Sequence, residues 1–267
     1  MVSVKKRILI TGASKGIGKA IARALLDNNY DVYGTSRNPD GIPSENRIPR
    51  VKYLTLDMTN YESIDRLIDE IGYVDILINN AGASQIGPVE EAPISLVHYL
   101  FQLNLLGIIY LTQRLLPAMR EKRSGTIINI SSLGGRIVVP FSSIYASTKH
   151  GLDGYAKGLR SEVKSYGIDV VNICPYGIHT NISPEQHYKE NSPYLEMLSR
   201  IFQIRTTAKA KAPGAEVVAK KVVKVLKKHN PRFSYVVGGI APILAFLNKV
   251  LPQRIAEKIY RKVFKLD

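Results

Sequence analysis

The 267-residue chain has very little cysteine and no long apolar run, and both absences narrow the class of protein. Its one cysteine, Cys174, excludes an internal disulfide and suits a reducing compartment. No stretch reaches about 18 uninterrupted apolar residues, so we expect no transmembrane helix. Residues 1–12 lead into a strand pattern and a glycine turn, which is unlike the apolar core of a secretion signal. We therefore expect a cytoplasmic protein.

Metal-ligand spacings, internal repeats and linkers are also missing from the sequence. The five histidines do not fall at the spacings typical of metal sites, so we predict no catalytic metal. No composition break divides residues 1–180, and the length fits one α/β domain with a large buried core. We expect residues 1–267 to form a single catalytic domain.

Acidic residues are scarce in the last quarter of the chain. Residues 205–267 contain 15 Lys and Arg against 3 acids, which is +12 of the total net charge of +15. Such a charge is compatible with nucleic acid or an acidic membrane as a partner, but the simpler interpretation is a solvated basic face on helices. No nucleic-acid motif accompanies the charge, so we expect no nucleic-acid binding. For the basic C-terminal extension, residues 239–267, two interpretations stay open. It could contact an acidic membrane surface peripherally, or its helices could pack on a subunit or over the pocket.

Strand and helix patterns alternate along most of the chain. Short apolar runs predict strands at 5–11, 31–36, 51–57, 74–79, 125–131, 167–174 and 233–237. Longer amphipathic patterns between them predict helices at 17–29, 58–72, 94–120, 143–166 and 213–228. Strands joined by helices form βαβ units, so the sequence predicts an α/β fold built on a parallel sheet.

A glycine-rich loop, TGASKGIG at 11–18, lies between the first expected strand and the first expected helix. In this context the loop is typical of dinucleotide binding, because backbone amides can approach a pyrophosphate and the helix start adds its positive end. The residues to which we assign this role are Gly12, Ser14, Lys15, Gly16, Ile17 and Gly18.

The end of the second expected strand indicates which dinucleotide is bound. An NAD-preferring fold places Asp or Glu there to bind the ribose 2′-hydroxyl. This chain has Ser36 followed by Arg37. The forked guanidinium of Arg37 suits a 2′-phosphate, and Lys15 could add a second cation. We predict NADP(H) as the cofactor; the alternative is that both are surface cations of a basic chain.

Residues 126–149 carry a pattern for acid–base chemistry. A buried strand ends at Ser131-Ser132, and Tyr145 and Lys149 then lie four residues apart on one face of an expected helix. A tyrosine of pKa about 10 exchanges protons poorly at neutral pH, but a nearby ammonium would lower its pKa. Ser132 could bond the same reacting oxygen. The pattern predicts a site that acts on a carbonyl or an alcohol.

Taken together, these segments resemble the short-chain dehydrogenase/reductase family across residues 5–180. The matching pieces are TGASKGIG (11–18), Asp57, NNAG (79–82), Asn104 in FQLNLLG, Ser132 in NISS, YASTK (145–149) and PYGIHT (175–180). The resemblance implies a doubly wound Rossmann sheet of about seven strands, in a homodimer or homotetramer. From NNAG through YASTK the chain looks most like the hydroxysteroid and retinol dehydrogenase branch, which implies a small hydrophobic ketone or alcohol as substrate.

The resemblance also implies four catalytic residues. Tyr145 would be the acid in carbonyl reduction and the base in alcohol oxidation. Lys149 would lower the pKa of Tyr145 and bind the nicotinamide ribose, and Ser132 would polarise the substrate oxygen. Asn104 would hold a water that links Lys149 to solvent. Because all four are present, an enzyme is favoured over a non-catalytic NADP-binding regulator; a reductase of small polar carbonyls is the other alternative.

Further cofactor contacts follow from the same resemblance. Asp57 would contact the adenine. The other residues that it implies as contacts are Asn79, Ala81 and Gly82 beside the adenosine ribose, Pro175, Ile178 and Thr180 beside the nicotinamide, and Tyr145 and Lys149.

Two features leave alternatives open near the substrate. The family usually has Pro-Gly at 175–176, whereas this chain has Pro175-Tyr176-Gly177. Either the backbone of Tyr176 avoids a positive φ, or the turn has shifted to Gly177.

Residues 181–210, with an apolar stripe at 195–202, are expected to cover an apolar substrate pocket; the alternative is that the stripe packs on the core or on a partner subunit.

Overall fold

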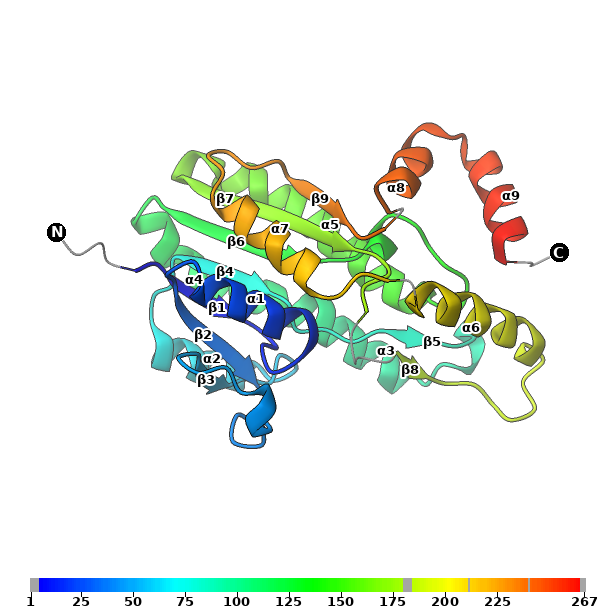
Figure 1. Cartoon of the computed structure of the whole chain (residues 1–267), viewed down its shortest axis with the longest axis horizontal. Helices are drawn as coiled ribbons and strands as arrows, with labels where there is room; N and C mark the ends of the chain where they lie inside the picture. The colour runs from blue at the N-terminus through cyan, green and yellow to red at the C-terminus, as the bar shows by residue number, and fades with distance from the viewer. Residues whose placement is uncertain (1–4, 180–183, 211, 240, 265–267) are drawn as a thin grey trace.

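The centre of the protein is a parallel sheet of seven strands in the order β3-β2-β1-β4-β6-β7-β9 (Figure 1). The structure is a computed structural model, and it describes residues 5–179, 184–210, 212–239 and 241–264. The chain winds outward from β1 to β3, returns to β4, and then winds outward on the other side. The predicted doubly wound sheet is thus confirmed. The strands of this sheet are β1 (Arg7–Ile10), β2 (Asp31–Ser36), β3 (Lys52–Thr55), β4 (Ile76–Asn79), β6 (Gly125–Ile130), β7 (Ile168–Pro175) and β9 (Ser234–Val237).

Helices cover both faces of the sheet. They are α1 (Gly16–Leu26), α2 (Tyr61–Ile71), α3 (Ile94–Phe101), α4 (Gly107–Glu121), α5 (Ser143–Val163), α6 (Leu195–Ala210), α7 (Glu216–Leu226), α8 (Ala241–Val250) and α9 (Gln253–Phe264). Short turns of 3₁₀ or π helix are η1 (Ser44–Asn46), η2 (Val89–Glu91), η3 (Gln102–Leu106), η4 (Leu133–Gly135) and η5 (Lys164–Tyr166). Because side chains alternate along a strand, Ile8 and Ile10 join one core with α1 and α7, whereas Leu9 joins the other with α2, α4 and α5.

The helix expected over 94–120 is divided by a π-helical turn. Asn104 lies in this turn, η3, and is fully buried. Such turns often occur at functional sites. By length and composition the joined helix Ile94–Glu121 is apolar enough to span a membrane. Leu111 and Met119 are nevertheless buried in the core between α4 and its neighbours, so this helix is part of the packed domain.

A row of buried amides crosses three adjacent strands, β4, β6 and β7. Asn79 donates to Asn129 at 2.9 Å, Asn129 donates to Asn172 at 3.0 Å, and Asn172 donates to Asp153 of α5 at 2.9 Å. The three asparagines lie opposite one another in the strand register. Each amide therefore bonds to the next, so each of these buried side chains has at least one partner, although Oδ1 of Asn79 has none in the described structure.

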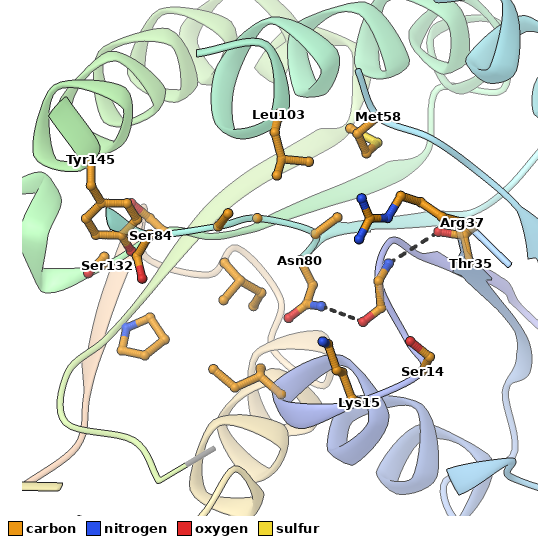
Figure 2. Close-up of a pocket in the computed structure, with 18 of the residues that line it drawn as sticks. Ser14, Lys15, Thr35, Arg37, Met58, Asn80, Ser84, Leu103, Ser132 and Tyr145 are labelled. Atoms are coloured by element: carbon orange, nitrogen blue, oxygen red, sulfur yellow. Dashed lines mark hydrogen bonds between the residues drawn. The ribbon is translucent and has the colours of Figure 1, made fainter. Parts of the chain in front are cut away.

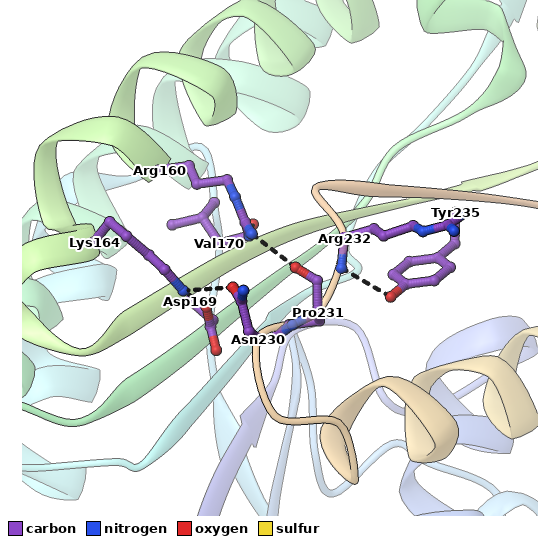
Figure 3. A network of polar contacts seen from close by, with 8 residues as sticks. All are labelled: Arg160, Lys164, Asp169, Val170, Asn230, Pro231, Arg232 and Tyr235. Carbon is purple, nitrogen blue, oxygen red and sulfur yellow. Dashed lines mark hydrogen bonds and ion pairs between the residues drawn. The ribbon is translucent and has the colours of Figure 1, made fainter.

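At the amino-terminal ends of the strands, polar contacts also hold β9 in place (Figure 3). Arg160 of α5 donates to the carbonyl oxygens of Val170 and Pro231, both at 2.7 Å. Lys164 donates to Asn230 at 2.9 Å. The turn that precedes β9 is thereby attached to α5 and β7.

The expected cover, 181–210, is only partly as predicted, and 181–183 lie outside the described residues. A short strand, β8 (Glu185–Gln186), pairs with β5 (Gln85–Ile86) in a second sheet that the sequence did not predict. In α6, Leu198 and Ile201 are fully buried. These two residues of the apolar stripe thus pack inward, in agreement with the alternative that the sequence left open, whereas Leu195 is 39% exposed.

Candidate active site

The carboxyl ends of the parallel strands open into a cleft of about 730 Å³, the usual place for a ligand in a doubly wound sheet. Figure 2 shows Ser14, Lys15 and Arg37 toward one end and Ser132 and Tyr145 at the other. The predicted site residues that line the cleft are Gly12, Ser14, Lys15, Ile17, Arg37, Asp57, Ala81, Gly82, Ser132, Tyr145, Lys149, Pro175 and Ile178. The structure therefore brings both halves of the predicted site into one cavity.

The glycine loop lies tightly against the loop that follows β4. A Cβ atom on Gly18 would lie 2.2 Å from the carbonyl oxygen of Gly12, so only glycine fits there. Asn80 donates from Nδ2 to the carbonyl oxygen of Thr11 at 2.9 Å and to that of Gly12 at 3.0 Å. Gly16 and Gly18 do not line the cleft. Gly18 permits close packing of the loop, and Gly16 takes a positive φ of 56° at the start of α1. Their contact with the cofactor stays a prediction.

Two cations stand at this end of the cleft. Lys15 comes directly before α1, and Arg37 follows β2. The ion pairs within the described part of the chain include neither of them. Asp57 also lines the cleft, but its Oδ1 accepts hydrogen bonds from the backbone and hydroxyl of Thr59, at 2.8 and 2.7 Å. The two cations are therefore available to a phosphate, in agreement with the NADP(H) prediction.

Asn79 does not line the cleft, contrary to the prediction. It belongs to the row of amides below, where its side chain is 1% exposed and bonded to Asn129. Its neighbour Asn80 lines the cleft instead. The NNAG motif identified the correct loop, but a motif does not tell which of two successive asparagines points out of the core.

Tyr145 lies in the first turn of α5 and is half-buried. Its side chain lies next to Ser132 at one end of the cleft (Figure 2). Burial raises the pKa of Tyr145 above its ordinary value of 10.0, and a hydrogen bond from Ser132 and the charge of Arg205 offset only part of this. The phenol is therefore protonated at neutral pH. This is the form that can donate a proton to a ketone oxygen.

Lys149 lies one turn further along α5 and is 5% exposed. Its Nζ donates to the carbonyl oxygen of Ile130 at 3.2 Å and lies 5.9 Å from the centre of the Tyr145 ring. Burial lowers the pKa of Lys149 to about 8. Ser132 and Arg205 are the groups that offset burial at Tyr145, and the expected effect of Lys149 on the pKa of Tyr145 stays a prediction.

Asn104 joins the loop after β4 to α5. Its Oδ1 accepts from the backbone of Ala83 at 3.0 Å, and its Nδ2 donates to Ala83 at 2.8 Å and to Thr148 at 3.2 Å. A Cβ atom on Gly82 would lie 2.9 Å from Oδ1 of Asn104 and 3.8 Å from Nζ of Lys149. Asn104 thus lies beside the lysine, as predicted, and its role as a water-binding residue in a proton relay stays a prediction.

The turn after β7 has shifted to Gly177, whose φ is +55°. Tyr176 keeps an ordinary φ, and its backbone amide donates to the carbonyl oxygen of Val237 at 2.9 Å. Of the two alternatives for this segment, the shifted turn is the one observed. Pro175 and Ile178 line the cleft, whereas Thr180 lies outside the described residues.

The structure also brings residues to this site that the sequence did not identify. Tyr99 and Leu103 line the cleft from α3 and η3. Arg205 of α6 donates to Oγ of Ser142 at 3.4 Å, and its charge acts on Tyr145 and Tyr176. The sequence placed Arg205 in the cover segment, but the helical pattern there does not tell which polar side chain faces the site.

A cleft with a glycine loop at one end and a tyrosine beside a serine at the other is typical of a nicotinamide-dependent oxidoreductase. The sequence model of the family described as short chain dehydrogenase matches residues 6–191. The chain belongs to the short-chain dehydrogenase/reductase family, and the resemblance inferred from its motifs is confirmed.

Individual relatives extend the similarity to nearly the whole chain. A 3-ketodihydrosphingosine reductase of Bacteroides thetaiotaomicron is 34% identical over 89% of this chain and 89% of that protein. An NADPH-dependent 3-dehydrocapnine reductase of Ornithobacterium rhinotracheale is 30% identical over 96% of each chain. The crystal structure of a short-chain dehydrogenase from Streptomyces avermitilis superposes with a TM-score of 0.84, at 31% identity and 99% coverage of both chains.

Proposed function

We propose that the protein reduces a hydrophobic ketone, of the kind found in long-chain lipids, to a secondary alcohol with NADPH. The observation that carries the proposal is the arrangement of one cleft. Two cations that have no carboxylate partner among the described residues lie at one end, and a protonated tyrosine lies beside a serine at the other. The two relatives named as reductases above, one of them NADPH-dependent, support the direction and the cofactor.

The cleft fits this cofactor. The glycine loop and the start of α1 would hold the pyrophosphate, Lys15 and Arg37 the 2′-phosphate, and Asp57 the adenosine half. Bound NADPH supplies the hydride.

The residues of the chain supply orientation and a proton. Ser132 donates a hydrogen bond to the ketone oxygen and orients it toward Tyr145. Tyr145 gives its proton to that oxygen as the carbonyl carbon takes up hydride, so that the ketone becomes an alcohol and the tyrosine a phenolate. The ammonium of Lys149 stabilises the phenolate, and Asn104 keeps the lysine and the adjoining loop in place.

Apolar and aromatic side chains at the catalytic end favour a hydrophobic substrate over a small polar carbonyl. Tyr99, Leu103, Tyr176 and Ile178 are among the residues that line the cleft. The test is the rate of NADPH consumption with a long-chain ketolipid and with short polar ketones and sugars. Turnover of the ketolipid that disappears in Tyr145→Phe supports the proposal. Activity confined to sugars or small polar ketones would overturn the substrate class, and no turnover of any ketone would support a non-catalytic NADP-binding protein.

The family resemblance also implies a homodimer or homotetramer. We propose that the active form is such an oligomer, in the cytoplasm or at the periphery of a membrane. Light scattering of the purified protein measures its mass, and a monomer at assay concentration would contradict the proposal.

The C-terminal extension has a surface suited to an acidic membrane. In Figure 1, α8 and α9 stand beside the main body of the protein, near α6. Ile243, Phe246 and Val250 of α8 are 61%, 63% and 53% exposed, and Ile255 and Ile259 of α9 are 46% and 43% exposed. Among the exposed residues of these helices are the cations Lys249, Arg254, Lys258, Arg261 and Lys262.

Exposed apolar side chains flanked by cations are the composition of interfacial helices. We therefore propose that α8 and α9 contact an anionic bilayer, the source of a lipid ketone. Sedimentation at low salt with vesicles containing phosphatidylserine tests this. We expect binding that falls with salt and falls further in a double variant, Ile243→Ser with Phe246→Ser. Val89→Ser, an exposed apolar side chain elsewhere, is the matched control. No sedimentation at low salt, or loss of self-association as the only effect of the double variant, would overturn the proposal.

A further inference from the structure

Arg205 is a half-buried cation whose bonding capacity is largely unused. It lies on α6, and its Nη1 donates to Oγ of Ser142 at 3.4 Å, which is long for a hydrogen bond. None of the ion pairs among the described residues includes Arg205. A guanidinium has five N–H donors, and withdrawing it from water is costly unless acceptors meet them.

The position of Arg205 connects it with the catalytic end of the cleft. Its charge acts on the side chains of Tyr145 and Tyr176, and both of these line the cleft. Lys15 and Arg37, which suit the cofactor phosphates, lie toward the opposite end (Figure 2). Arg205, which bonds to Ser142 three residues before Tyr145, is therefore a cation near the catalytic end, in addition to Lys149, that the cofactor phosphates do not explain.

The carboxylates of the cleft do not neutralise this charge. Of the carboxylates that line the described cleft, Asp57 lies with the cofactor loops and bonds to Thr59. Glu185 is exposed, so water screens its charge. Burial lowers the pKa of the Arg205 guanidinium from its ordinary value, but an arginine keeps its charge at any physiological pH.

We propose that Arg205 binds an acidic group, such as a sulfonate, carboxylate or phosphate, that the substrate carries close to its ketone. The inference rests on the proposed ketone reduction and assigns the head group of the substrate. An anion accepts charge-assisted hydrogen bonds from the N–H groups that the protein leaves unmet. Arg205 would thus select ketolipids with an acidic head group over neutral ones, while the apolar lining accepts the chain.

Two long-chain probes of equal length test the inference: a β-keto sulfonate and the corresponding β-keto methyl sulfone. They differ mainly in one negative charge, and neither loses carbon dioxide. In the presence of NADPH we expect kcat/KM to favour the sulfonate by about tenfold or more, because a charged hydrogen bond contributes about 1.5–3 kcal/mol. Arg205→Gln should bring the ratio close to unity, and Arg205→Lys should keep part of it. Arg200→Gln is the matched control, because Arg200 lies on the same helix, where it pairs with Glu196; it should leave the ratio unchanged.

The same variants distinguish this role from activation of Tyr145. If Arg205 only favours the phenolate, Arg205→Gln will lower kcat/KM equally for both probes, and the inference is wrong. Equal use of the two probes by the wild-type protein would also overturn it, while the proposed ketone reduction would stand.

If neither probe is reduced, the ketone reduction fails, and direct binding still decides the role of Arg205. Calorimetry of the protein with NADP⁺ compares decane sulfonate with decyl methyl sulfone. Tighter binding of the sulfonate that is lost in Arg205→Gln supports an anion site. Equal binding of the two compounds, or none, overturns it.

Discussion

The two ends of the sheet use half-buried arginines in opposite ways. At the amino-terminal ends of the strands, Arg160 has two short hydrogen bonds, of 2.7 Å each, to main-chain carbonyl oxygens (Figure 3). At the carboxyl ends, Arg205 has one long bond of 3.4 Å. The same contrast holds for other polar groups there: Oγ of Ser131 is buried without a partner in the described structure, and Lys149 gives a single bond, of 3.2 Å, to the backbone.

The contrast separates groups that hold the fold from groups that are available to ligands. A buried polar group with complete bonding contributes to stability, and its loss leaves partners unsatisfied. A group with incomplete bonding costs stability and is retained where a ligand or a reaction needs it. Substitutions at the two ends should therefore separate into effects on folding and effects on catalysis.

The largest expected effect is at the catalytic end. Tyr145→Phe removes the proton donor, and general acid catalysis contributes up to about 10⁴-fold, so kcat for the ketolipid should fall by about a thousandfold. The melting temperature should change little, because the ring is retained. The matched control is Tyr155→Phe, a partly buried tyrosine on the same helix whose hydroxyl bonds to Thr112. An equal loss of activity in both variants would contradict the assignment.

At the other end, Arg160→Met should act on stability alone. The carbonyl oxygens of Val170 and Pro231 would lose charged donors, which costs about 2–4 kcal/mol of the free energy of unfolding. Urea unfolding measures this loss. At a temperature where the variant remains folded, kcat/KM should stay within about threefold of wild type. A tenfold or larger drop in kcat/KM without destabilisation would break the division between the two ends.

The burial of Lys149 should destabilise the folded protein by an amount that depends on pH. The folded protein holds this amine at a pKa of about 8, against an ordinary value of 10.5 for a lysine in water. Between these values the unfolded chain binds more protons, so stability rises as pH increases through this window, by about 3 kcal/mol in total. The Lys149→Met variant should lack this rise and should be more stable than wild type at neutral pH, although inactive. Parallel unfolding curves of the two proteins at neutral and alkaline pH would show the difference. An identical pH dependence would contradict it.

The smallest effect concerns the cofactor end. Arg37→Asp removes a cation from the cofactor end of the cleft and offers an acceptor to a 2′-hydroxyl. We expect the ratio of kcat/KM for NADPH over NADH to shift by at least about tenfold toward NADH. Arg47→Asp, which alters an exposed arginine that donates to Pro39, should leave the ratio unchanged. A shift below tenfold for Arg37→Asp would make the assignment of this arginine wrong.

Much of this arrangement could be predicted from the sequence, because the informative residues are close to one another along the chain. The glycine loop, the end of β2 and the spacing of Tyr145 and Lys149 are local patterns, and their order predicted the sheet and the cleft. The interruption of the helix at Asn104 had no such signal, because a π turn changes the helical spacing by only one residue.

The remaining features depend on packing between distant segments. Asn79 and Asn80 are identical in type, and only the side-by-side asparagines of the next strands decide which is buried. The pKa of Tyr145 follows from burial and from Arg205, sixty residues further along the chain. Which polar residue of α6 faces the site is likewise fixed by the way the helix packs, and the sequence predicted only that this segment lies nearby.

The row of amides has a consequence for the alignment of the catalytic groups. Asn129 can bond to both Asn79 and Asn172 only when the three strands stand at one relative height. A shift of β6 by one residue would bring an isoleucine into the row and leave several buried amide groups unbonded, at about 1–3 kcal/mol for each. The asparagines therefore act as a ruler across the sheet. They fix the register of the three strands, and with it the positions of Ser132 after β6 and of Pro175 at the end of β7. The place where a ketone contacts the reactive groups depends on these positions.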